Sequence, residues 1–412
     1  MRILILSQYF DPEPTFKGLL FAHELMKQGH VVEVLTGFPN YPLGKLYPGY
    51  RMKLLQRENL GGIRVTRVPL FPSHDSGGFR RMASYLSFAG TAALMGPWVV
   101  RKPDVIYAYH GNATIGVPAW VIGMIRRVPF VLDIQDLWPD SVTSSGMLPA
   151  KFQAMIPALE AWCRFLYRRS ARIVVLSPGL KRVLMARGVP EEKVEVIPNW
   201  CDEIQIQPGS ARPEEESLLE GRFNVVMAGN MGRMQGLDVV LEAAQLLQGP
   251  APQVQFVLVG GGVDRPRLEK RMASLGLKNI LFLPGRPMDE IGALLHRADA
   301  LLVHLKDDPL FAITIPSRIQ AYLAVGRPLL CGVRGDGAEL VKEAGAGFCF
   351  EPECPEALAG AVLTVLNLST EERREIGRRG SEFYKDRLSL SVGTKAFLRF
   401  FDRTLSGRSQ FS

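Results

Sequence analysis

Residues 225–236, VVMAGNMGRMQG, join an apolar run to a glycine-rich turn, and an amphipathic segment at 237–247 follows directly. A short apolar run that ends in a turn and leads into helical periodicity predicts a buried strand, a loop and a helix. The same alternation of short apolar runs and longer helical segments extends over the whole chain, which is typical of parallel sheets covered by crossover helices. The sequence therefore predicts an α/β fold.

The alternation of apolar runs occurs in two sets. The first set predicts strands at 2–6, 31–35, 63–68, 105–109, 130–134, 173–176 and 195–197. The second set predicts strands at 223–227, 254–259, 280–283, 300–303 and 328–332. Residues 205–220 between the sets are polar and contain turn-forming residues such as Pro208-Gly209-Ser210. We expect a first domain at 1–202, a linker at 203–222 and a second domain at 223–387.

The composition excludes several classes of protein. Of the 412 residues, 47% are hydrophobic and 22% are charged, which is unlike a disordered, collagenous or coiled-coil chain. The five cysteines include no C-x-x-C pair and cannot form a disulfide framework, so we expect a reducing compartment. The first apolar run, at 3–6, is too short for an export signal, and we expect a cytoplasmic protein.

The charge is unevenly distributed. Residues 1–200 contain 24 Lys and Arg against 14 Asp and Glu, whereas residues 201–412 contain 25 against 27. A basic half indicates an anionic partner, either nucleic acid or a membrane surface. Basic pairs such as Arg80-Arg81 and Arg101-Lys102 flank apolar stretches, whereas nucleic-acid surfaces interleave basic residues with aromatic side chains. We therefore expect a membrane surface and no nucleic acid.

One uncharged stretch, Met82–Val100, has two interpretations. It lies between Arg81 and Arg101 and has the length of about 20 residues that a membrane span needs. Its serines, glycines and proline make it weakly hydrophobic, which favours a buried helix of the first domain. The alternative is a helix that dips into one leaflet and places its flanking arginines on phosphate headgroups.

Glycines after predicted strands indicate anion-binding sites. Gly18 begins the predicted helix 19–28, and a helix N-terminus that starts at glycine presents free N–H groups to an anion, with Lys17 beside it. Glycine turns follow two further strands, at Gly229 to Gly236 and at Gly260-Gly261-Gly262. Two such turns at the carboxyl ends of adjacent strands predict a nucleotide site. The spacing is not G-x-G-x-x-G, which disfavours a nicotinamide or flavin cofactor.

Taken together, these segments resemble the retaining glycosyltransferases of the GT-B fold, of the glycosyltransferase family 4 type. The branch most similar synthesises bacterial surface polysaccharides and is close to the fucosamine-type transferases. In the first half the resemblance rests on Tyr9-Phe-x-Pro12-Glu13, Gly29-His30 through Pro39-Asn40-Tyr41-Pro42, Asp133-x-x-Asp136-x-Trp138-Pro139-Asp140, and Val196 to Asn199. In the second half it rests on Gly229-Asn230-x-Gly232-x-x-Gln235-Gly236-Leu237, Ile315-Pro316-Ser317-Arg318, and Tyr322-x-Ala324-x-Gly326-Arg327-Pro328.

The resemblance implies two facing Rossmann-like domains with a C-terminal helix, 388–412, that crosses back to the first domain. The alternative for this segment is an amphipathic membrane helix, because residues 390–405 carry an apolar stripe. The implied enzyme moves a sugar of the (N-acetyl)hexosamine type from a UDP-sugar donor to a lipid-diphosphate-linked acceptor, for O-antigen, capsule or lipopolysaccharide synthesis. It would use no metal or other cofactor and would attach peripherally to the inner face of the cytoplasmic membrane.

The implied site has three parts. The candidate catalytic residues are His110 and Asp136. His110 ends a predicted strand and could hydrogen-bond a hydroxyl of the donor sugar. Asp136 follows another predicted strand and could orient the acceptor hydroxyl or accept its proton. The candidate donor-binding residues are Lys17, Gly18, Gly229, Asn230, Gly232, Gln235, Gly260, Gly261, Pro316, Ser317 and Arg318. The candidate acceptor-side residues are Asn40, Tyr41, Trp138 and Asp140.

Departures from the resemblance leave alternatives open. Two glutamates common in relatives correspond here to Ile313 and Ala321, and the Arg and Lys that commonly hold the diphosphate correspond to Asn230 and Gln235. A nucleotide-sugar epimerase of the same fold, or a non-catalytic partner protein, therefore remains an alternative. At single positions, His110 is alternatively a buried structural residue and Asp133 a cap of the next turn. Asp307-Asp308 is interpreted as a solvated turn rather than a metal site.

Overall fold

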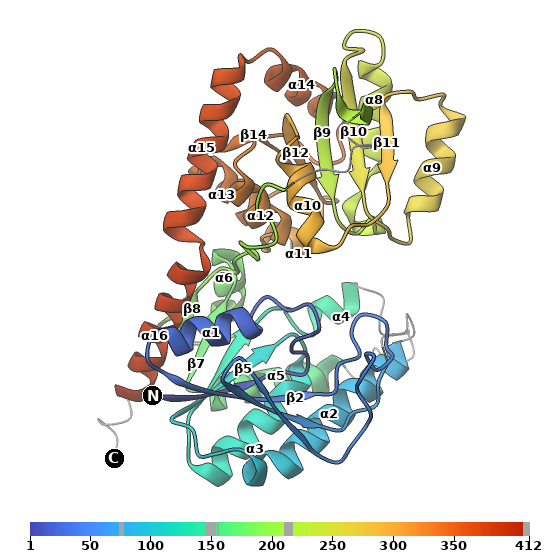
Figure 1. Cartoon of the computed structure of the whole chain (residues 1–412). Helices are drawn as coiled ribbons and strands as arrows, with labels where there is room; N and C mark the ends of the chain where they lie inside the picture. The colour runs from blue at the N-terminus through green and yellow to red at the C-terminus, as the bar shows by residue number, and fades with distance from the viewer. Residues whose placement is uncertain (74–77, 145–153, 155, 210–216, 407–412) are drawn as a thin grey trace. The chain divides into compact units, whose positions relative to one another are not determined.

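The computed structural model describes residues 1–73, 78–144, 154, 156–209 and 217–406. The chain divides into two compact units, Met1–Pro198 with Gly393–Ser412, and Asn199–Val392 (Figure 1). Each unit is an α/β domain built around its own sheet. Of the predicted linker, 210–216 lies outside the described residues, while Ile206 is buried in the second unit.

The first unit contains an eight-stranded sheet with the order β3-β4-β2-β1-β5-β6-β7-β8 in the described residues. All neighbouring strands are parallel except β3 and β4, which pair antiparallel at the edge. The strands are β1 Arg2–Leu6, β2 Val31–Gly37, β3 Gln56–Leu60, β4 Ile63–Val68, β5 Val105–His110, β6 Phe130–Ile134, β7 Arg172–Val175 and β8 Val194–Val196. The helices are α1 Leu19–Lys27, α2 Gly78–Val99, η1 Ala113–Ile115, α3 Gly116–Arg126, α4 Asp140–Ser144, α5 Ile156–Arg169, α6 Pro178–Ala186 and η3 Glu191–Lys193.

The C-terminal helix α16, Leu390–Ser406, completes the core of the first unit. The Phe397 ring lies 5.2 Å from that of Phe21 on α1 and 5.4 Å from that of Tyr107 on β5, centroid to centroid. Phe397, Phe400 and Phe401 are fully buried, so the apolar stripe of this helix is covered by protein. The prediction that the C-terminal helix crosses back is confirmed.

The second unit contains a wholly parallel six-stranded sheet with the order β11-β10-β9-β12-β13-β14 in the described residues. Its strands are β9 Phe223–Ala228, β10 Val254–Val259, β11 Ile280–Leu283, β12 Ala300–His304, β13 Leu329–Gly332 and β14 Gly347–Cys349. Its helices are η4 Arg233–Gln235, α8 Asp238–Leu247, α9 Arg265–Ser274, α10 Met288–Leu295, α11 Pro309–Ala312, α12 Ser317–Val325, α13 Asp336–Glu343, α14 Pro355–Leu366 and α15 Thr370–Arg387.

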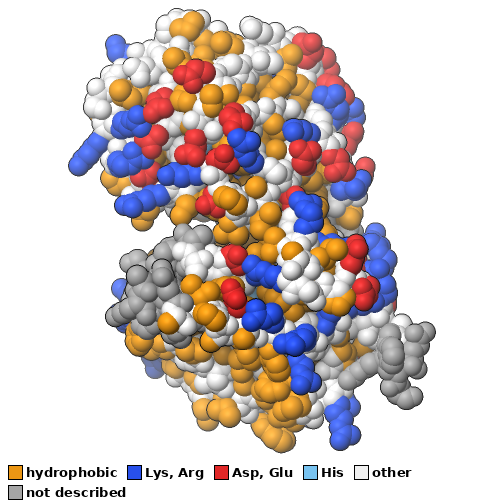
Figure 2. Space-filling view, turned by 180° about the vertical axis from the view of Figure 1, so that it is seen from behind, with side chains coloured by type: hydrophobic (Ala, Val, Ile, Leu, Met, Phe, Trp, Pro, Cys, Tyr) orange, Lys and Arg blue, Asp and Glu red, His pale blue; other side chains and the backbone are white. Residues whose placement is uncertain are grey.

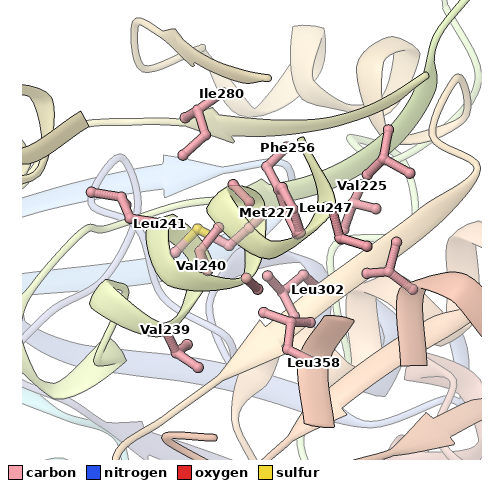
Figure 3. Close-up of a cluster of buried hydrophobic side chains, with 14 of the residues drawn as sticks. Val225, Met227, Val239, Val240, Leu241, Leu247, Phe256, Ile280, Leu302 and Leu358 are labelled. Carbon is pink, nitrogen blue, oxygen red and sulfur yellow. The ribbon is translucent and has the colours of Figure 1, made fainter. Parts of the chain in front are cut away.

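The core of the second unit lies between its sheet and α8. Val225, Met227 and Phe256 from the central strands pack with Val240 and Leu247 of α8 (Figure 3). Strands that are buried on both faces consist of nearly continuous apolar residues, and β9 and β10 are buried along their whole length. This core holds β9 and β10 side by side, and the glycine turns follow from their carboxyl ends.

Candidate functional site

The two predicted glycine turns contact each other. β9 and β10 pair in parallel with Ala228 opposite Val259, so the turns that follow leave the sheet together. The N–H of Gly229 donates to the carbonyl of Val259 at 2.8 Å, and the N–H of Met231 donates to that of Gly261 at 2.7 Å. Gly260 has φ +137°, and a Cβ atom there would collide with the carbonyl oxygen of Gly229. Only glycine allows this approach, and it produces a surface of bare backbone.

Arg318 fastens the first glycine turn to helix α12. Its Nε donates to the carbonyl of Ala228 at 2.7 Å and its Nη2 to that of Asn230 at 2.8 Å. The sequence analysis placed Arg318 among the donor-binding residues, but two of its guanidinium donors are engaged with the backbone. Arg318 therefore positions the loop, and its charge still lies beside it.

Helix α12 begins at the same place. Its N-cap, Pro316, provides no side-chain hydrogen bond, and Ser317 is exposed. The first N–H groups of a helix lack intrahelical partners and carry the positive end of the dipole. Tyr322, one turn further, accepts the N–H of Ala228 at 2.8 Å through its hydroxyl oxygen. The helix start and the glycine turn are thus held together from two positions.

Gln235 and a histidine that the sequence analysis missed shape the rest of this turn. The Oε1 atom of Gln235 accepts the N–H of Gly232 at 2.8 Å, which closes the loop. His304, at the end of β12, donates from Nδ1 to the carbonyl of Gln235 at 2.6 Å and accepts the N–H of Glu353 at Nε2. Burial lowers the pKa of His304, so its ring is neutral and bridges the two loops.

Two further cations near this turn were not singled out from the sequence. Lys306 follows β12, and its backbone N–H donates to the carbonyl of Met234 at 3.0 Å. Its Cγ lies 3.1 Å from where a Cβ of Gly236 would be. Lys306 and Arg233 are exposed, and within the described residues their side chains have no ion-pair partner. Backbone N–H groups, a helix start and these cations suit a diphosphate.

In the first unit, the buried carboxylate of Glu13 joins two loops. Its Oε1 accepts the N–H groups of Asn40 and Tyr41, both at 2.7 Å, and its Oε2 accepts that of Phe10 at 3.1 Å. Burial raises the pKa of Glu13 to about 7 although these hydrogen bonds oppose the shift. Glu13 was part of the quoted motif but not a candidate residue. It positions Tyr41, whose ring lies 5.0 Å from that of Tyr9.

His110 is buried at the carboxyl end of β5. Neither ring nitrogen has a hydrogen-bond partner among the described residues. Burial lowers its pKa to about 4, so the imidazole is neutral at pH 7. Buried polar groups in proteins are nearly always hydrogen-bonded, and a catalytic role is one explanation for an exception. Its catalytic role stays a prediction that this geometry favours.

Asp136 lies in the loop after β6, and its side chain is exposed to solvent. The surrounding protein still removes enough hydration to raise its pKa to about 6, against the opposing charge of Arg81. Tyr85 and Tyr109 are close enough for the Asp136 charge to raise their pKa values as well. An ionised carboxylate at this position can bind and orient a hydroxyl group as a hydrogen-bond acceptor.

The other acceptor-side candidates have structural partners. Trp138 is buried, and its ring lies 6.2 Å from that of Tyr85. Asp140 pairs with Arg187 at 2.6 Å, and the same guanidinium donates to the carbonyl of Trp138. Asn40 is buried, and its Oδ1 has no hydrogen-bond partner in the described residues.

The predictions for Lys17 and Gly18 need correction. The Lys17 ammonium is fully buried and pairs with Asp133 at 2.6 Å, and Tyr107 donates to the same carboxylate. The start of α1 is occupied by the protein's own anion, because Asp11 Oδ2 accepts the N–H of Leu19 at 2.7 Å. A Cβ at Gly18 would collide with that carboxylate. Neither residue is available to a donor, and Asp133 is a counterion rather than a turn cap.

A separate hollow of about 440 Å³ in the second unit is lined by several arginines, among them Arg327, Arg373 and Arg374. Asp299 and Pro328 in its wall directly precede β12 and β13, so it lies at the amino-terminal edge of the sheet. Open parallel sheets bind ligands at the carboxyl edge, and we therefore place the candidate site at the glycine turns.

In the described part of the chain, no group of three or more His, Cys, Asp or Glu side chains is arranged to hold a metal ion. Asp307 pairs with Arg334 at 2.9 Å, and Asp308 accepts the N–H of Leu310 at the start of α11. Both carboxylates of this pair therefore have local structural roles.

Comparison with known proteins agrees with this architecture. Residues 19–200 match the family model described as a glycosyl transferase 4-like domain, and residues 211–383 match that of glycosyl transferases group 1. The protein WcaI of Escherichia coli (strain K12), named as a colanic acid biosynthesis glycosyl transferase, is 29% identical over 89% of this chain and 93% of its own. WbjE of Pseudomonas aeruginosa, named as a glycosyltransferase, is 25% identical over 65% of this chain and 67% of its own.

A solved structure with the same fold is HepE of Anabaena in complex with UDP. It superposes with a TM-score of 0.71 at 17% identity, covering 98% of this chain and 100% of HepE. Together with the two family matches, this shows that the chain is a glycosyltransferase with the GT-B fold. One of its relatives, WcaI, is named for colanic acid biosynthesis, and the predicted fold class is confirmed.

Proposed function

We propose that the second unit binds a UDP-sugar of the (N-acetyl)hexosamine type. The observation that carries this proposal is the contact of the glycine turns at Gly229 and Gly260 beside the start of α12. This surface offers backbone N–H groups, a helix dipole and the charges of Arg318 and Lys306 to a diphosphate. The UDP complex of HepE, which shares the fold, supports UDP as the nucleotide.

We further propose that transfer proceeds with retention of the anomeric configuration and needs no metal. The bond between the sugar C1 and the diphosphate oxygen breaks, and a bond from C1 to the acceptor oxygen forms on the same face. The acceptor proton passes to the departing phosphate oxygen, so that UDP and the glycoside are the products. Asp136 orients the acceptor hydroxyl, and His110 hydrogen-bonds a hydroxyl of the donor sugar. The cations and N–H groups around the turns stabilise the leaving diphosphate.

The proposed acceptor is a sugar on a lipid diphosphate, in the synthesis of a surface polysaccharide such as O-antigen or capsule, at the inner face of the cytoplasmic membrane. The similarity to WcaI supports the pathway class, because that relative is named for colanic acid biosynthesis. We propose that the first unit binds this acceptor.

Thermal unfolding with UDP, GDP, ADP, CMP and dTDP, each in the presence of a chelator, tests the donor proposal. UDP should raise the melting temperature selectively, with about 2.7 kcal/mol of stabilisation at a hundredfold excess over its Kd. Lys306→Met should weaken UDP binding about tenfold or more by removing a charged hydrogen bond. The matched control is Lys278→Met, an exposed lysine that precedes β11 at the other edge of the sheet.

Absence of stabilisation by any nucleotide would refute the proposed donor site. Stabilisation by GDP alone would show that the donor is a GDP-sugar and not a UDP-sugar. Transfer is then assayed from UDP-N-acetylhexosamines to a polyprenyl-diphosphate-linked sugar, with the anomeric configuration of the product read by NMR. An inverted product would refute the retaining mechanism, and loss of turnover on chelation would refute metal independence. Release of free sugar without any glycoside would favour the epimerase alternative.

A further inference from the structure

Helix α2 has an apolar face that the protein leaves uncovered. Its other face is packed in the first unit, where Tyr85, Phe88 and Ala92 are buried. Successive residues of a helix are rotated by about 100° around its axis. Four exposed apolar residues of α2 therefore lie together on the side opposite to these buried residues. These exposed residues and their exposed fractions are Phe79 79%, Leu86 56%, Leu94 76% and Trp98 74%.

The end of α3 extends this face. Gly96 of α2 lies against Ile122 of α3, because a Cβ at Gly96 would fall within 3.0 Å of the Ile122 side chain. Arg126 donates from Nη2 to the carbonyl of Val100 at 3.2 Å and so ties the end of α3 to the end of α2. Met124 and Ile125 of α3 are 57% and 45% exposed. Figure 2 shows apolar side chains gathered over the end of the first unit where Figure 1 places α2 and α3.

Basic residues lie at the end of α2. Arg101 and Lys102, directly after α2, are exposed and have no carboxylate partner for their side chains within the described residues. Residues 42–127, which contain both helices, hold twelve Lys and Arg against three Asp and Glu. A protein partner would offer carboxylates to only part of such a surface, whereas an anionic bilayer offers hydrocarbon and phosphate together.

We propose that the outer face of α2 and the end of α3 form a docking surface that inserts into one leaflet of an anionic membrane. No helix in the described parts of the chain is long and apolar enough to span a bilayer, and α2 is already fixed in the core of the first unit. The helix lies in the membrane plane with Phe79, Leu94 and Trp98 among the acyl chains near the headgroups. Arg101 and Lys102 contact the phosphates.

This inference rests on the proposed function in one respect, since docking would bring the enzyme to a lipid-linked acceptor. The docking itself is a separate property. Trp98 suits the boundary between headgroups and acyl chains because its ring is apolar and its N–H is polar. The 22 residues of α2 extend about 33 Å, which gives a long and shallow line of contact.

Cosedimentation of the full chain with vesicles of phosphatidylcholine, alone or mixed with phosphatidylglycerol, tests the proposal. The wild type should bind the mixed vesicles, and binding should weaken with salt. Leu94→Glu with Trp98→Glu should lower vesicle affinity at least about tenfold, because two large apolar side chains lose their burial. Arg101→Gln with Lys102→Gln should lower the preference for phosphatidylglycerol about tenfold or more, because each basic residue near an anionic surface contributes to binding.

The matched control is Leu246→Glu, at an exposed leucine of α8 in the second unit, which should bind vesicles like the wild type. All variants should keep the wild-type melting temperature and its increase with UDP. The proposal would be overturned if the wild type did not bind mixed vesicles. It would also be overturned if the Leu94→Glu, Trp98→Glu variant bound them as well as the wild type does. If the wild type were a dimer and this double variant a monomer, the apolar face would bind a second copy of the chain instead of a membrane. Failure to bind UDP would refute the donor site and leave the docking result intact.

Discussion

Replacing Gly260 with alanine tests whether the contact of the glycine turns is required. The residue has φ +137°, where an L-residue costs about 1–3 kcal/mol. Its Cβ would also fall well inside 3.0 Å of the Gly229 carbonyl oxygen, and overpacking against backbone costs a further 1–3 kcal/mol or so. We expect the free energy of unfolding of the second unit to fall by about 2–5 kcal/mol. For a domain of this size, that lowers the melting temperature by about 5–15 °C.

The neighbouring Gly261→Ala variant is the control for this experiment. A Cβ at Gly261 meets no atom within 4 Å, so its melting temperature should change little. Both variants reduce the entropy of the unfolded chain by the same amount, and that contribution cancels in the comparison. Differential scanning calorimetry with and without UDP measures both effects. If Gly260→Ala melts within about 2 °C of Gly261→Ala and binds UDP equally well, the turns are not in obligatory contact.

Three further predictions concern the first unit. Lys17→Met should lower the free energy of unfolding by about 3–5 kcal/mol because it leaves the carboxylate of Asp133 buried without its cation; an unchanged denaturation midpoint would contradict the buried pair. His110→Asn should lower kcat about a hundredfold with a nearly unchanged circular dichroism spectrum, and full activity would assign this histidine to structure alone. The rate should fall as pH decreases through about 6, because protonated Asp136 no longer accepts a hydrogen bond from the acceptor. Asp136→Asn should remove this acid limb from the residual rate, whereas Glu13→Gln should leave it in place; the opposite pattern would assign the limb to Glu13, whose pKa burial raises to about 7.

Most of the fold could be predicted because buried parallel strands leave a local pattern. Every predicted strand is present, with its ends displaced by no more than two residues. Among the residues that the structure describes, two strands were not predicted. β3, Gln56–Leu60, is polar and pairs antiparallel at the edge of the sheet, where burial does not require an apolar run. β14, Gly347–Cys349, has three residues, too few to show any periodicity.

The uncharged stretch at 82–100 is a segment whose environment the sequence pattern left undecided. The sequence predicted either a buried helix or a helix at the membrane surface. The structure contains a helix with one buried and one exposed face, and the exposed fractions of Leu94 and Trp98 distinguish the two sides. Composition alone could not separate them, because both faces are apolar.

The sequence by itself determined the two α/β units and the glycine turns, since both follow from residues that are neighbours in the chain. Only the tertiary structure decided which polar groups meet. Lys17 is paired with Asp133, 116 residues away, and Arg318 grips the carbonyls of a loop 88–90 residues before it. The position of Lys306 beside the glycine turn also depends on the order of strands in the sheet. Periodicity is a local property, whereas the partner of a charge depends on which distant segments the folded core brings together.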